Sequence, residues 1–164
     1  MSFQSFDDPA GPRPGRERLD RLRSELQRLD LAGFLVPHAD EQQSEYLPQS
    51  AERLAWLTGF TGSAGMAAVL KDEAAVFVDG RYTLQVRAQT DPDAWRREHL
   101  IEMPPARWLA TRLKPGERLG YDPKLMTVAE VRRFGEAAKT AGAELVAVDE
   151  NPVDRIWTDR PSPP

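Results

Sequence analysis

Helical and extended patterns alternate along the middle of this 164-residue sequence, and this alternation constrains the fold more than any other feature. The short apolar runs that predict strands are 34–36, 66–70, 74–78, 95–100, 118–121 and 144–148, and the helical patterns are 15–29, 51–57, 81–90, 104–112 and 128–141. Only three residues separate the second and third strands, so these two should form a β-hairpin. The pattern predicts an α/β domain in three α/β/α layers, with a mixed sheet of about six strands and helices on both faces.

Local signals mark where two of these helices begin. Asp79 is positioned to cap the helix expected at 81–90. Thr127 and Glu130 have the spacing of a capping box at the start of the last long helix. The apolar face predicted for that last helix consists of Val128, Val131, Phe134, Ala138 and Ala141.

Proline is concentrated at the two ends of the chain, which hold half of its 14 prolines. Such density disfavours regular structure, so residues 1–14 are predicted to be a flexible arm and 158–164 a linker. A domain is expected between them at 15–157. The C-terminal prolines fit a domain boundary or an ordinary frayed end, and composition favours neither interpretation.

Composition excludes several classes of protein. The net charge of −4 argues against a nucleic-acid module, which needs clustered positive charge. The absence of cysteine excludes disulfide scaffolds, zinc ribbons and thiol nucleophiles. No apolar run approaches the roughly 20 residues of a membrane span, and the N-terminus does not resemble a signal peptide. We therefore expect a cytoplasmic protein that binds neither nucleic acid nor membrane.

The search for catalytic motifs finds no phosphate-binding loop, no zinc-protease motif and no serine-hydrolase elbow. The two histidines, His38 and His99, do not lie at metal-ligand spacing from each other or from carboxylates, so no metal ligand and no catalytic residue is predicted. The arginines of the first helix alternate with acidic residues, which predicts a solvated and internally paired face.

Two segments differ from ordinary structural loops. In one, Trp56 and Phe60 flank a glycine-containing turn; in the other, Arg81 and Tyr82 follow Asp79 just beyond a strand, where α/β folds present functional groups. These four aromatic and arginine residues are the candidate substrate or interface residues, and we expect them near one edge with Arg81 partly exposed. Each segment has a competing interpretation: Trp56 and Phe60 are core residues, and Arg81 pairs with a local carboxylate. The residues alone favour these competing interpretations.

Several motifs, in this order, resemble the N-terminal domain of the Xaa-Pro aminopeptidases (aminopeptidase P) in the creatinase/prolidase superfamily. The similarity runs from about residue 15 to the end, and one departure is Gln42, where relatives often have histidine. The motifs are Gly-Phe-Leu-Val-Pro (33–37), Asp40 with Ser-Glu-Tyr (44–46), Leu-Thr-Gly-Phe-Thr-Gly-Ser-Ala-Gly (57–65), Val-Asp-Gly-Arg-Tyr (78–82), Gly-Tyr-Asp-Pro (120–123) and Glu-Asn-Pro-Val-Asp-Arg-Ile-Trp-Thr-Asp-Arg-Pro (150–161).

The resemblance implies that this chain is the non-catalytic part of a longer enzyme. Relatives continue into a second, related domain and then a catalytic domain, whose carboxylates and histidine bind two metal ions, usually manganese. There a bridging water attacks the peptide bond before a proline in the second position. The implied partners are these missing domains, peptides with proline in position 2, and a second copy in a homo-oligomer, and the implied cofactor lies outside this chain.

Two other functions compete with this one. A stand-alone binding module could keep the same fold without any peptidase, although a natural module has little reason to end in a proline-rich linker. A self-sufficient metalloenzyme is disfavoured because this sequence has too few metal ligands.

Overall fold

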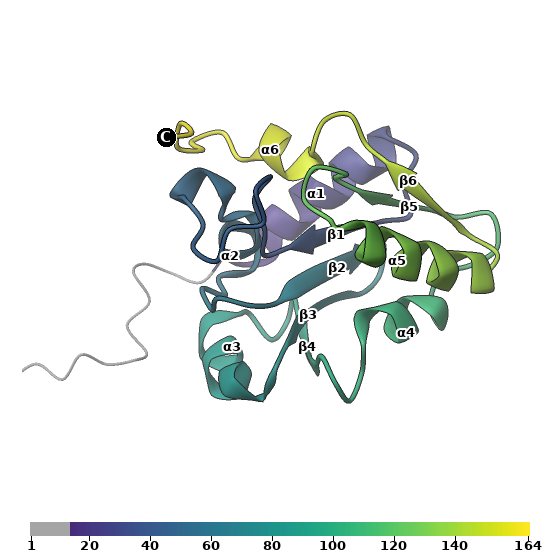
Figure 1. The fold of residues 1–164 in the computed structure, drawn as a ribbon, viewed down its shortest axis with the longest axis horizontal. Coiled ribbons are helices and arrows are strands. Elements are labelled where there is room, and N and C mark those ends of the chain that lie inside the picture. Colours follow the sequence, from purple (N-terminus) through teal and green to yellow (C-terminus); the bar gives the residue numbers. More distant parts are fainter. Residues whose placement is uncertain (1–13) are drawn as a thin grey trace, which may run out of the picture.

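A mixed six-stranded sheet forms the centre of the protein in a computed structural model that describes residues 14–164 (Figure 1). The strands lie in the order β4-β3-β2-β1-β5-β6. β2 is antiparallel to both of its neighbours, and the other five strands share one direction. Their bounds are β1 Gly33–Pro37, β2 Met66–Leu70, β3 Ala74–Val78, β4 Arg96–His99, β5 Arg118–Tyr121 and β6 Glu144–Ala147.

Helices cover both faces of this sheet, which confirms the predicted three-layer α/β/α fold with one hairpin (Figure 1). One face carries α1 (Arg16–Arg28), α2 (Arg53–Thr58), α3 (Thr83–Gln89) and α6 (Pro152–Ile156). The other face carries α4 (Pro105–Ala110) and α5 (Val128–Thr140).

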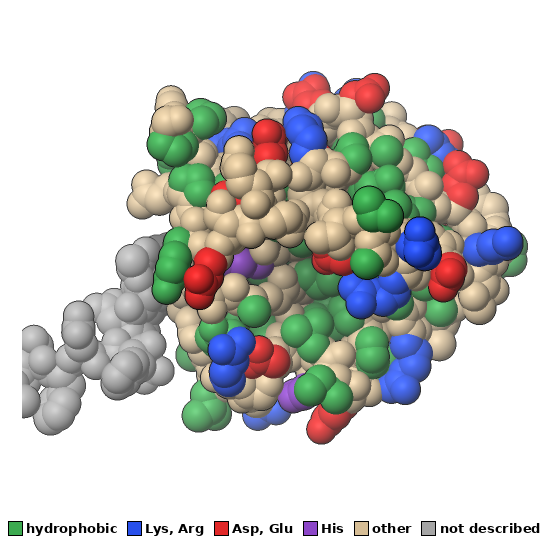
Figure 2. All heavy atoms as spheres, viewed as in Figure 1, with side chains coloured by type: hydrophobic (Ala, Val, Ile, Leu, Met, Phe, Trp, Pro, Cys, Tyr) green, Lys and Arg blue, Asp and Glu red, His purple; other side chains and the backbone are tan. Residues whose placement is uncertain are grey.

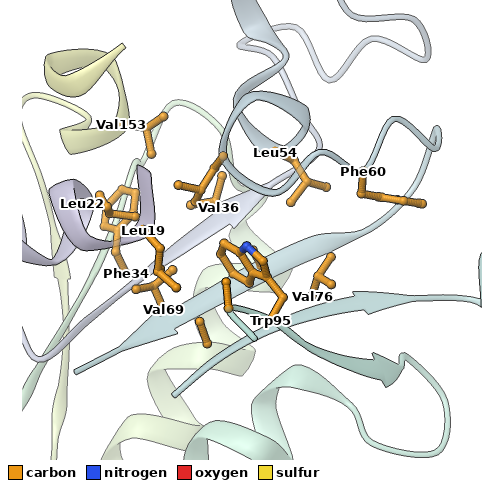
Figure 3. Close-up of a cluster of buried hydrophobic side chains, with 14 of the residues drawn as sticks. Leu19, Leu22, Phe34, Val36, Leu54, Phe60, Val69, Val76, Trp95 and Val153 are labelled. Atoms are coloured by element: carbon orange, nitrogen blue, oxygen red, sulfur yellow. The ribbon is translucent and has the colours of Figure 1, made fainter. Parts of the chain in front are cut away.

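The two hydrophobic cores follow from side-chain alternation along the strands. Phe34 and Val36 point into the core beneath α1 and α2, whereas Leu35, between them, points into the core beneath α4 and α5. Figure 3 shows the first of these cores, with Trp95 among the side chains from the strands and helices. Every residue of β1, β2 and β3 is buried because both faces are covered, which explains why these strands are continuous apolar runs.

The last long helix begins as predicted, and four of the five residues predicted for its apolar face pack into the core. Thr127 and Glu130 form the capping box, because each side chain accepts a hydrogen bond from the other residue's backbone N–H. The assignment of Val128 to the apolar face is wrong, since this side chain is 76% exposed. At about 100° per residue, Val128 lies roughly 120° around the helix from Phe134, which is buried.

Asp79 caps a shorter element than predicted. Its carboxylate accepts a hydrogen bond from the backbone N–H of Arg81, which begins a 3-10 turn at Gly80–Tyr82, and α3 follows only from Thr83. Near the other end of the domain, α6 was not predicted; it begins with Pro152 after the cap residue Asn151. Of the predicted arm at 1–14, all but the last residue lies outside the described residues.

The arginines of α1 connect elements rather than forming only a solvated face. Arg21 donates to the carbonyl of Ile156 at 3.0 Å, and Arg23 donates to that of Leu70 at 2.8 Å. The predicted internal pairing holds in part, because Arg28 pairs with a glutamate one turn earlier. Sequence periodicity identified the apolar stripe of this helix but gave no information on distant backbone carbonyls.

Candidate functional site

Loops from five strands meet at one edge of the sheet. Four of them follow the carboxyl ends of β1, β3, β4 and β5, and the fifth leads into β2, whose first residue pairs with Pro37 at the end of β1. We call this edge the carboxyl edge; it comprises residues 38–48, 59–65, 79–84, 100–104 and 122–128. In α/β proteins the carboxyl ends of the strands commonly carry the functional groups.

Arg81 projects from this edge and is held by its own loop. Its guanidinium donates to both carboxylate oxygens of Asp79, with the shortest contact, from Nη2 to Oδ2, at 2.8 Å. Those side-chain hydrogen bonds hold the pKa of Asp79 below its ordinary value. The Arg81 side chain is nevertheless 70% exposed, so it is paired locally and still accessible.

Tyr82 connects this loop to the glycine-containing turn. Its ring packs edge-on against Phe60 with the centroids 5.5 Å apart, and its hydroxyl lies 2.5 Å from Ser63 Oγ. The turn depends on glycine here, because a Cβ at Gly62 would lie 2.2 Å from a Phe60 ring carbon. Phe60 is buried, as the competing core interpretation expected.

Trp56, the fourth candidate, has different neighbours. Its ring stacks on Trp157 with the centroids 5.4 Å apart, and the guanidinium of Arg18 lies 4.5 Å from its ring centroid. The structure therefore brings Phe60, Arg81 and Tyr82 together, while Trp56 holds the C-terminal segment against α2.

The loop after β1 is ordered by a buried carboxylate. Asp40 accepts hydrogen bonds from the backbone N–H groups of Ser44, at 2.8 Å, and Gln42, at 3.1 Å. The Ser44 bond is the main reason that the pKa of Asp40 is lowered. The Gln42 side chain is exposed on this loop.

A cavity of about 320 Å³ opens at the same edge, between α4 and α5. His38 lines it with a side chain that is only 9% exposed, and its Nε2 has no hydrogen-bond partner among the described residues. Burial lowers the pKa of His38, so the ring is neutral at pH 7. Sequence reasoning assigned no role to His38, and an isolated histidine after a proline carries no signal that could have assigned one.

Metal ligands do not assemble in the part of the chain that the structure describes. Within residues 14–164 no three His, Asp or Glu side chains are placed to hold a metal ion together. None of the helices in this range is long and apolar enough to cross a membrane.

Comparison with known proteins gives a consistent set of matches. A sequence model of the creatinase/prolidase N-terminal domain matches residues 18–156. The probable Xaa-Pro aminopeptidase P of Arthroderma otae is 36% identical over 163 residues, which are 98% of this chain and 26% of that protein. The chain thus spans about a quarter of the length of the curated relatives it matches.

Two solved structures share the fold. The X-prolyl aminopeptidase of Caenorhabditis elegans, described as a cytosolic enzyme with a di-nuclear active site, matches with a TM-score of 0.79 and 32% identity, over 89% of this chain and 26% of its own. The N-terminal domain of a cytoplasmic peptidase from Mycobacterium tuberculosis matches with a TM-score of 0.62 and 28% identity, over 85% of this chain and 97% of its own.

Proposed function

Because this chain belongs to the creatinase/prolidase N-terminal domain family, we propose that it serves as the non-catalytic N-terminal domain of a metal-dependent Xaa-Pro aminopeptidase. The whole enzyme would remove the N-terminal residue that precedes a proline. The observation that carries this proposal is the asymmetric coverage: nearly the whole chain aligns with Xaa-Pro aminopeptidases, but with only about a quarter of each. The substrate class is therefore peptides with proline in the second position.

The metal chemistry belongs to the part of the enzyme beyond this chain. The residues described here do not fit a dinuclear centre, because no three potential ligands come together. In the proposed enzyme two metal ions, which we propose are manganese, would be held by the catalytic domain and would activate the attacking water. A cytoplasmic location is proposed on the likeness to the cytosolic Caenorhabditis elegans enzyme.

Within that enzyme, the proposed role of this domain is to shape access to the active site and to contact the other domains. We place the domain at residues 15–157 and a linker to a second domain at 158–164. Arg81 and Tyr82 are the candidates for a substrate or interdomain contact, supported by their place at the carboxyl edge and by the exposure of Arg81. Trp56 supports the linker through its stack with Trp157.

Substitution of Arg81 tests this role in the full-length protein. Arg81→Lys keeps the charge but loses the planar fork that can bind a carboxylate bidentately, so turnover of an X-Pro peptide should fall several-fold. The melting temperature should stay nearly unchanged, because the Arg81 side chain is largely exposed and lysine keeps its charge beside Asp79. Arg28→Lys is the matched control, since Arg28 is also exposed and pairs with a nearby carboxylate at 3.0 Å.

The control variant should leave turnover unchanged. A large loss of stability in Arg81→Lys, with normal turnover per folded molecule, would show instead that Arg81 is part of the scaffold. The length of the native open reading frame separates the proposal from a stand-alone binding module, because only the enzyme requires a catalytic domain in the same polypeptide.

A further inference from the structure

Large hydrophobic side chains are exposed at one edge of this protein. Within residues 14–164 they are Tyr46, Leu84, Ile101 and Val128, and each is between 76% and 81% exposed. Tyr46 follows β1, Leu84 follows β3, Ile101 follows β4 and Val128 follows β5. All four therefore lie at the carboxyl edge, and we refer to them as the apolar rim.

The opposite edge of the sheet differs in the kind of side chain that it exposes. Its exposed side chains are mostly charged, such as Lys71 and Asp72 in the β-hairpin and Lys114 before β5. Single exposed hydrophobic residues are ordinary on a protein surface. Four of them gathered at one edge, on segments that follow four different strands, are not, because clustered exposed apolar surface usually marks an interaction site.

Hydrogen bonds join the segments that carry these residues in two pairs. The Gln43 amide donates to the carbonyl of Leu125 at 3.0 Å, which ties the loop after β1 to the loop after β5. Leu100 donates its backbone N–H to the carbonyl of Val78, which ties the loop after β4 to the end of β3. Each segment that carries a residue of the apolar rim is thus tied to one neighbouring segment of the same edge.

The cavity lies at the same edge, and one of its lining residues, His38, carries a buried nitrogen without a hydrogen-bond partner among the described residues. Leu100, which precedes Ile101, and Glu130, two residues after Val128, also line the cavity. Figure 2 shows a hollow on this side of the molecule with hydrophobic side chains on its floor. A buried nitrogen such as His38 Nε2 costs free energy when it lacks a hydrogen bond.

The C-terminal segment lies close to the same edge. Trp157 stacks on Trp56 of α2, and Arg160 donates to the carbonyl of Ser50 at 2.8 Å, in the segment that connects β1 to α2 (Figure 1). If the proposed function is correct, the polypeptide continues beyond this point for most of its length. The continuing chain would then start next to the carboxyl edge.

We propose that the carboxyl edge is the docking surface for the remainder of the same polypeptide, beyond residue 164. This inference rests on the proposed function and assigns the contact to particular residues. The apolar rim packs against the following domains, and a side chain from them enters the cavity that His38 helps to line. The test must distinguish this occupant of the carboxyl edge from a second copy of the 164-residue chain.

Thiol labelling of single-cysteine variants tests the proposal, because residues 1–164 contain no cysteine of their own. Ile101→Cys and Val128→Cys are made in the full-length protein, with Asp72→Cys at the opposite edge as the matched exposed control. The rate of maleimide labelling is followed by mass spectrometry of the peptide that carries each site. We expect labelling at the two rim positions to be at least about tenfold slower than at the control, and equally fast in denaturant.

The same variants of the 164-residue chain identify the occupant. There the rim positions should label as fast as the control at every protein concentration. Rim labelling as fast as the control in the full-length protein would overturn the docking surface, and slow labelling in the 164-residue chain would assign it to a second copy. Peptidase activity is measured separately, so an inactive full-length protein with a protected rim would contradict the proposed function and leave the docking surface standing.

Discussion

At the scale of single residues, a buried arginine holds the C-terminal helix in place. The side chain of Arg53 in α2 is only 8% exposed and makes two parallel hydrogen bonds to Asp154 in α6, at 2.7 and 3.0 Å. Arg160 adds a second contact to the same carboxylate at 3.2 Å. Sequence reasoning identified the segment that contains Arg53 but not its partner, because 101 residues separate the two side chains.

Removal of this guanidinium should destabilise the protein. Arg53→Ala leaves a partly buried carboxylate with only one of its two arginine partners, which should cost about 2 kcal/mol of the free energy of unfolding. Urea denaturation of the 164-residue chain measures this change. The free energy of unfolding of Arg53→Lys should lie between those of Arg53→Ala and the natural protein, since lysine keeps the charge but loses the bidentate geometry.

The control for this prediction is Arg28→Ala, which removes an exposed ion pair on α1 and should cost less than about 1 kcal/mol. An Arg53→Ala protein as stable as the Arg28→Ala protein would mean that the buried pair contributes little, and that α6 is held by its apolar contacts alone.

At the scale of elements, patterns that act over a few residues were predictable and contacts between distant segments were not. The capping box at Thr127 was identified correctly because both of its partners lie within one turn. The exposure of Val128 was missed because an apolar residue in the first turn was counted without its angle around the helix. All four candidate residues were expected near one edge, and Phe60, Arg81 and Tyr82 meet there. The partner of Trp56 lies 101 residues along the chain and could not be predicted.

The capping box predicts a specific loss for α5. Thr127→Ala removes the side-chain oxygen that accepts the N–H of Glu130, and the free energy of unfolding should fall by about 1 kcal/mol. Thr140→Ala at the other end of the helix is the control, because its hydroxyl only donates to a carbonyl of the preceding turn. Equal losses in the two variants, measured by urea denaturation, would show that the cap adds nothing specific.

At the scale of the whole molecule, the fold fits the proposed role of a non-catalytic domain within an enzyme. The two cores on either side of the sheet are filled by its own helices, so the domain does not depend on other domains for its hydrophobic interior. What remains exposed is the carboxyl edge, with the apolar rim, the cavity and Arg81. The proposed division of labour gives this domain the docking and access surfaces and gives the metal chemistry to the rest of the polypeptide.

One comparison of peptide hydrolysis tests this division most directly. The full-length protein and the 164-residue chain are each incubated with manganese and an X-Pro-X peptide, and release of the N-terminal residue is measured against metal-free samples. We predict metal-dependent release by the full-length protein and none by the 164-residue chain, whose described residues assemble no metal site. Release by the 164-residue chain above its metal-free sample would contradict the assignment of this chain as a non-catalytic domain.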